Sequence, residues 1–121
     1  MSNKKTLIIG ATTKQDRYAY LAAKKLLKHG HDIVLLGQKE GTIDGNDIAI
    51  EPAPIDNIDT VTLYLNPEKQ LPLYNYVIGL NPKRIIFNPG TENPEFEKLL
   101  NQNKIEVLEA CTLVMLSIGN Y

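Results

Sequence analysis

The sequence predicts an α/β fold of three layers, in which helices cover both faces of a mostly parallel sheet. Along the 121 residues, short runs rich in aliphatic and β-branched side chains alternate with longer stretches of helical periodicity, a pattern typical of βαβ units. Several of these runs are apolar without interruption, as expected of strands buried on both faces. Hydrophobic residues make up 43% and charged residues 22% of the chain. These are ordinary values for a globular protein, so we expect residues 1–121 to form one domain.

The chain is expected to begin with a strand, a glycine and a helix. Residues 6–9 are apolar or β-branched and predict a buried strand that ends at Gly10. Residues 17–29 predict a helix, because alanines and Leu26 recur at helical spacing on one face. Gly30 is well suited to the position that follows the C-terminal end of this helix.

The rest of the chain repeats the alternation of strands and helices. Further strands are expected at residues 32–36, 47–50, 60–65, 84–88 and 105–108. The strand at 47–50 is short, and we place it at the edge of the sheet. Pro67 suits the first turn of a helix that opens at Asn66, and Asn93-Pro94 combines a capping side chain with a proline at the first helical position, so a helix should follow each pair.

The composition argues against several kinds of partner. A net charge of −1 provides no basic surface for non-specific nucleic-acid binding. No apolar run is long enough to span a bilayer, and the first residues lack the apolar core of a signal peptide. The single cysteine, Cys111, cannot form an internal disulfide, which favours a cytoplasmic location. A homo-oligomer remains possible.

The loop after the first strand is the best candidate for a ligand site. In an open parallel sheet, ligands bind beyond the carboxyl ends of the strands. Gly10 allows a sharp turn there, Thr12 and Thr13 add hydroxyl groups, and the following helix offers free N–H groups that attract phosphate. Lys14 and Arg17 add positive charge. Ala11 completes the loop; a plain strand-to-helix turn with solvated cations is the alternative interpretation.

The next loop indicates which nucleotide fits. The dinucleotide fingerprint has three glycines and an acidic residue after the second strand that binds a ribose hydroxyl. This chain keeps only Gly10, and the second strand is followed by Gly37, Gln38 and Lys39 before the first carboxylate, Glu40. A lysine suits a phosphorylated ribose better than a bare diol. NADP or coenzyme A (CoA) is therefore favoured over NAD.

These motifs, taken in order, resemble the family of small stand-alone CoA-binding proteins, which is similar to the nucleotide-binding domain of succinyl-CoA synthetase. The resemblance rests on residues 9–12 with Arg17, then on 23–30, 43–45, 59–61, 66–68, 88–90 and Cys111. It implies a Rossmann-like sheet of five or six strands, a CoA diphosphate on residues 10–13 and the adenine near Gln38 and Lys39. The chain departs from the family pattern at Gly37-Gln38, which stand in place of Asn-Pro, and at Ala110, which stands in place of an arginine.

The sequence-based hypothesis is a non-catalytic module that binds CoA or an acyl-CoA. Asn66, Pro67, Asn88 and Gly90 would border the path of the pantetheine arm. No catalytic residue and no metal site are proposed, since the two histidines flank Gly30 at the opposite edge of the predicted sheet. Two alternatives stay open: a small NADP-dependent oxidoreductase, and a relative that keeps the fold, has lost the ligand and acts in protein association.

Overall fold

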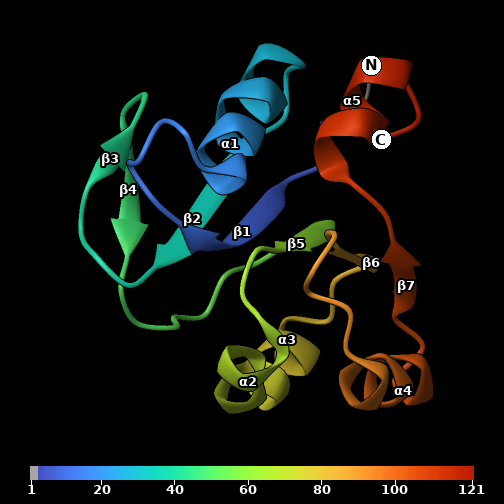
Figure 1. The fold of residues 1–121 in the computed structure, drawn as a ribbon. Coiled ribbons are helices and arrows are strands. Elements are labelled where there is room, and N and C mark those ends of the chain that lie inside the picture. The colour runs from blue at the N-terminus through green and yellow to red at the C-terminus, as the bar shows by residue number, and fades with distance from the viewer. Residues whose placement is uncertain (1–2) are drawn as a thin grey trace.

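The computed structural model describes residues 3–121 and shows a sheet covered by helices on both faces (Figure 1). The chain runs through β1 (Thr6–Ala11), α1 (Tyr18–Lys28), β2 (Ile33–Gly37), β3 (Thr42–Ile43), β4 (Asn46–Ala49), β5 (Thr60–Leu63), α2 (Pro67–Gln70), the 3₁₀ helix η1 (Leu71–Leu73), α3 (Tyr74–Leu80), β6 (Arg84–Phe87), α4 (Pro94–Gln102), β7 (Glu106–Glu109) and α5 (Thr112–Ile118). The predicted α/β fold is confirmed. Among the described residues, no helix is both long and apolar enough to cross a membrane.

The sheet has seven strands in the order β3-β4-β2-β1-β5-β6-β7. The six strands from β4 to β7 in this order run parallel, and β3 pairs antiparallel with β4. The six parallel strands agree with the upper end of the expected five or six, and β3 adds a seventh strand to the sheet. Because β3 covers its outer side, β4 does not lie at the edge, contrary to the sequence-based placement. The chain winds outward from β1 in both directions, so the switch point lies between β1 and β5.

Two layers of apolar side chains hold the helices to the sheet. On one face, Ile8 of β1 packs in a buried cluster with Ala23 and Leu26 of α1 and Leu116 of α5. On the other face, the neighbouring strand residue Ile9 belongs to a second cluster, with Val77 of α3, Phe96 and Leu100 of α4, and Phe87 of β6. Strand side chains alternate between faces, so the uninterrupted apolar runs at residues 7–9 of β1 and 85–87 of β6 follow from the cover on both sides.

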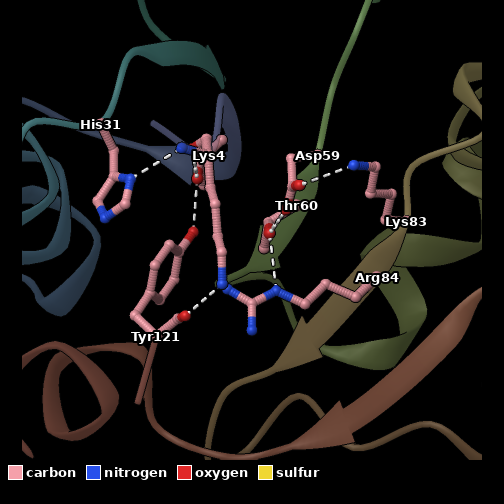
Figure 2. A network of polar contacts seen from close by, with 8 residues as sticks. Lys4, His31, Asp59, Thr60, Lys83, Arg84 and Tyr121 are labelled. Atoms are coloured by element: carbon pink, nitrogen blue, oxygen red, sulfur yellow. Dashed lines mark hydrogen bonds and ion pairs between the residues drawn. The ribbon is translucent and has the colours of Figure 1, made fainter. Parts of the chain in front are cut away.

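At the amino edge of the sheet, Tyr121 joins the two ends of the described chain. Its ring lies 5.0 Å from the His31 ring and 4.5 Å from the Arg84 guanidinium carbon, measured to the ring centroid. The backbone N–H of Lys4 donates to Nδ1 of His31 at 3.0 Å, and the Lys4 ammonium donates to the carbonyl of Tyr121. Figure 2 shows these side chains converging from separate segments of the chain. His31 therefore lies in a structural network at the edge where the sequence placed it.

Candidate functional site

The start of α1 presents unfilled hydrogen-bond donors at the carboxyl edge of the sheet. The N–H groups of a first helical turn have no partner within the helix. Arg17 is the capping residue, and no side chain donates or accepts a capping bond there. The loop instead closes on itself: the Arg17 N–H donates to the Lys14 carbonyl at 3.1 Å, and the Lys14 N–H donates to Thr12 Oγ1 at 3.2 Å. The first-turn amides and the positive end of the helix dipole are thus available to an anion.

Gly10 shapes this loop from inside the sheet. The strand does not end at Gly10, as the sequence suggested, but continues through it to Ala11, with a shift of the β1–β2 register between Ile9 and Ala11. Gly10 has a φ of +95°, and a Cβ there would lie 3.1 Å from the carbonyl carbon and oxygen of Tyr64. A glycine is therefore required by the protein's own backbone as well as by any ligand.

A cleft of about 630 Å³ opens in front of α1 at the switch point. Eight of the residues predicted from the sequence line it together: Gly10, Ala11, Thr12, Thr13, Lys14, Arg17, Gln38 and Lys39. They come from the loop after β1, the start of α1 and the loop after β2. Separate segments of the chain meet here because the carboxyl ends of parallel strands share one edge of the sheet.

Seven further residues line the cleft that were not among the contacts proposed from the sequence, although Tyr18 was an alternative candidate for the ligand loop. These are Tyr18, Ala19, Tyr64, Leu65, Lys69, Pro89 and Thr91. Tyr64 and Leu65 directly follow β5, but the sequence-based strand at 60–65 included them, so their position at the carboxyl edge was hidden. No sequence signal placed Lys69 at the cleft. It lies inside the short helix α2, and the packing of that helix against the rest of the protein brings it to the cleft.

The cleft is strongly positive, although the chain as a whole carries a net charge of −1. Its lining includes Lys14, Arg17, Lys39 and Lys69 and no carboxylate. The ion pairs found among residues 3–121 are Lys24–Asp44 and Lys83–Asp59, so none of the four cleft cations is neutralised by one. Cations of this kind, next to helix amides, favour a ligand with several negative charges.

A second, apolar hollow of about 420 Å³ adjoins the cleft on the other side of β1. Ile9, Leu36, Ile50, Pro52 and Leu73 supply most of its apolar wall. Gly10, Gln38, Leu65 and Lys69 line both spaces. A ligand with a charged part and an apolar part could therefore occupy both.

Four predicted site residues do not line the cleft. Asn66 caps α2, with its Oδ1 accepting from the Lys69 N–H at 3.1 Å, and Pro67 is the first residue of that helix. Gly90 is exposed in a turn with a φ of +92°. Its neighbours Pro89 and Thr91 are the residues that reach the cleft from this loop.

Asn88 has a structural role in place of the predicted contact with ligand. Its side chain is only 2% exposed. Its Nδ2 donates to Thr62 Oγ1 at 2.7 Å and to the Leu63 carbonyl at 2.8 Å, and its Oδ1 accepts from the Thr112 N–H at 2.9 Å. These bonds occupy the amide group and tie the end of β6 to β5 and to the start of α5.

Tyr64 is the titratable group that borders the inner part of the cleft. Burial raises the pKa of its hydroxyl to about 12, against the opposing effect of the neighbouring Thr112 and Thr62 hydroxyls. A phenol with such a pKa stays protonated at neutral pH and is poorly matched to proton transfer, which works best with a pKa near the working pH. The hydroxyl oxygen is itself buried and has no hydrogen-bond partner among the described residues, so a ligand in the cleft would meet Tyr64 through the rest of the residue.

Comparisons with known proteins give the family and the fold of this chain. Residues 4–117 match a family model described as a CoA binding domain. A crystal structure of an uncharacterized protein is similar, with 54% identity, 100% of both chains covered and a TM-score of 0.97. A Thermus thermophilus protein described as cell-free ID.343 shares the fold at 19% identity, with a TM-score of 0.86 over 98% of this chain and 91% of that one.

A hypothetical protein from Pyrococcus horikoshii OT3 also shares the fold at 24% identity, with a TM-score of 0.87 over 96% of this chain and 83% of that one. No curated protein matches the chain. The family model spans nearly all of the described residues, and the cleft lies where a doubly wound sheet binds nucleotides. The chain belongs to the CoA-binding domain family.

Proposed function

We propose that this protein is a non-catalytic module that binds CoA, free or acylated, in the cleft in front of α1. The observation that carries the proposal is the combination of uncapped amides at the start of α1 with four cations that form no ion pair among residues 3–121. No carboxylate lines the cleft itself, and Glu68 lines the adjoining hollow. CoA carries a diphosphate and a 3′-phosphate, so its charge is complementary to this surface. Membership of the CoA-binding domain family supports the same ligand.

The two adjoining spaces suggest how the ligand would lie. The diphosphate would accept from the amides of residues 10–13 and of the first turn of α1, with Lys14 and Arg17 balancing its charge. The adenine would enter the apolar hollow beside Gln38, where Leu36 and Pro52 offer it contact. Lys39 would lie near the phosphorylated ribose.

The pantetheine arm would leave the cleft past the loop after β6. Pro89 and Thr91 line this side and would contact the arm. Gly90, between them, and Asn66 and Pro67, beside the lining residue Leu65, would border the same path. Asn88 is left out of the proposed contacts because its amide is occupied within the protein.

Isothermal titration of the full chain with CoA tests the proposal. We expect saturable binding of one CoA per chain. Absence of heat up to about 1 mM CoA, which would mean an affinity too weak to count as specific, would reject it if circular dichroism shows the protein folded. NADPH is titrated in parallel. A response to NADPH alone would favour a small NADP-dependent oxidoreductase.

The absence of binding by either nucleotide would point to the remaining alternative, a relative that has kept the fold and acts in protein association. Sedimentation of the same sample then distinguishes a monomer from a stable dimer. A dimer that protects the start of α1 from solvent would support that alternative.

A further inference from the structure

Lys69 lies where the charged cleft and the apolar hollow meet. Of the four residues that line both spaces, Gly10, Gln38, Leu65 and Lys69, it is the charged one. It approaches from α2, across the cleft from Lys14 and Arg17 on the α1 side. No ion pair among residues 3–121 occupies its ammonium group. The cleft therefore carries positive charge on two walls.

The helix that carries Lys69 is fixed to the rest of the protein. Gln70, the next residue, is 0% exposed. Its Nε2 donates to the Leu65 carbonyl at 2.8 Å and to the Thr91 carbonyl at 2.9 Å, and its Oε1 accepts from Asn93 Nδ2 at 2.9 Å. Asn66 caps the same helix. The backbone of Lys69 is thus held in place before any ligand arrives, which lowers the cost of ordering the site.

We infer that Lys69 determines specificity for the 3′-phosphate of CoA, acting from the opposite wall to Lys39. The inference rests on the proposed function. In CoA, the ribose joins the adenine to the diphosphate, so a ligand with its adenine in the apolar hollow and its diphosphate at α1 has its ribose at the junction. The 3′-phosphate projects from that ribose, and Lys69 is the cation at the junction.

Titration of the full chain with CoA and with dephospho-CoA, which lacks the 3′-phosphate, tests the inference. Wild type should bind CoA about ten- to a hundredfold more tightly than dephospho-CoA, as expected for charge-assisted contacts. Lys69→Gln should lose about tenfold in affinity for CoA and less than about twofold for dephospho-CoA. Lys69→Arg keeps the charge and should keep most of the preference.

Lys98→Gln is the matched control, because Lys98 is an exposed helical lysine on α4 that lines neither space. It changes the net charge equally and should leave both affinities unchanged. If Lys69→Gln weakens the affinity for CoA and for dephospho-CoA equally, Lys69 acts on the diphosphate and the inference is overturned. An unchanged affinity of that variant for CoA would also overturn the inference. If wild type binds neither compound, the proposed function fails first, and the inference fails with it.

Discussion

Gly10 occupies a point where two stretches of backbone pass close together. Its φ of +95° and the 3.1 Å from a Cβ to the Tyr64 carbonyl make any side chain there strained and tightly packed. The sequence predicted a sharp turn and a close ligand approach at Gly10, but it gave no sign of the Tyr64 backbone beside it. The sequence did not indicate the internal contacts of Asn88 either. Its expected position after a strand suggested a ligand contact, whereas its amide joins β5, β6 and α5. Position after a strand therefore indicates where a residue lies and not what it binds.

Gly10→Ala should destabilise the protein. An L-residue at this φ costs about 1–3 kcal/mol in the free energy of unfolding, and the Cβ would also press on the Tyr64 carbonyl. Urea denaturation measures the loss. Gly79→Ala in α3 is the matched control, since a Cβ there meets nothing within 4 Å and should stabilise the helix by about 0.5–1 kcal/mol. A Gly10→Ala variant as stable as wild type would show that the strand relaxes around the methyl group.

Helix starts were the elements that the sequence indicated best. Asn66-Pro67 and Asn93-Pro94 were predicted to begin helices, and both asparagines accept a hydrogen bond from the third helical N–H. The β3–β4 hairpin was missed. Its two turn residues, Asp44 and Gly45, both have positive φ, as in the tight turns that an Asp-Gly pair favours. Asp-Gly is typical of a turn, but a strand of two residues on one side is too short for a sequence pattern to indicate.

Asn93→Ala should cost more than the loss of an ordinary cap. Removing a capping side chain costs about 1 kcal/mol. Asn93 Nδ2 also donates to Gln70 Oε1 at 2.9 Å and to the Tyr74 hydroxyl at 2.8 Å, both buried, so we expect a total of about 2–4 kcal/mol. Asn66→Ala, at the exposed cap of α2, serves as the comparison and should lose about 1 kcal/mol or less. Equal losses in urea denaturation would mean that the buried bonds of Asn93 add nothing.

At the scale of the whole molecule, the order of the strands decides which residues meet. Three of the four cleft cations follow strands or begin α1, and the sequence could place them because parallel strands end at one edge. Lys69 depends on the buried contacts of Gln70, which join segments far apart in the chain. The amino-edge network has the same origin, since Lys4, His31 and Tyr121 come together only in the folded sheet (Figure 2). Periodicity predicts elements, but contacts between distant side chains need the topology.

The amino-edge network should make stability depend on pH below neutrality. Burial, together with the positive charges of Lys4, His29 and Arg84, lowers the pKa of His31 below its ordinary value of 6.5. Protonation at Nδ1 would also remove the acceptor of the Lys4 N–H. The unfolded chain then binds more protons than the folded one just below pH 6.5, so stability is full above that value and is lost as the pH falls toward the folded pKa.

Urea midpoints measured between about pH 7.5 and pH 5 should therefore decrease on the acid side. His31→Gln should flatten this decrease, because its side chain no longer titrates, although the variant should be less stable near neutrality. His29→Gln, at the same turn, should keep the acid-side decrease, which separates the network from a general effect of histidine. A steep decrease that persists in His31→Gln would assign the pH dependence to carboxylates elsewhere in the chain. The amino-edge network would then stabilise the fold through its packing and hydrogen bonds and not through the titration of His31.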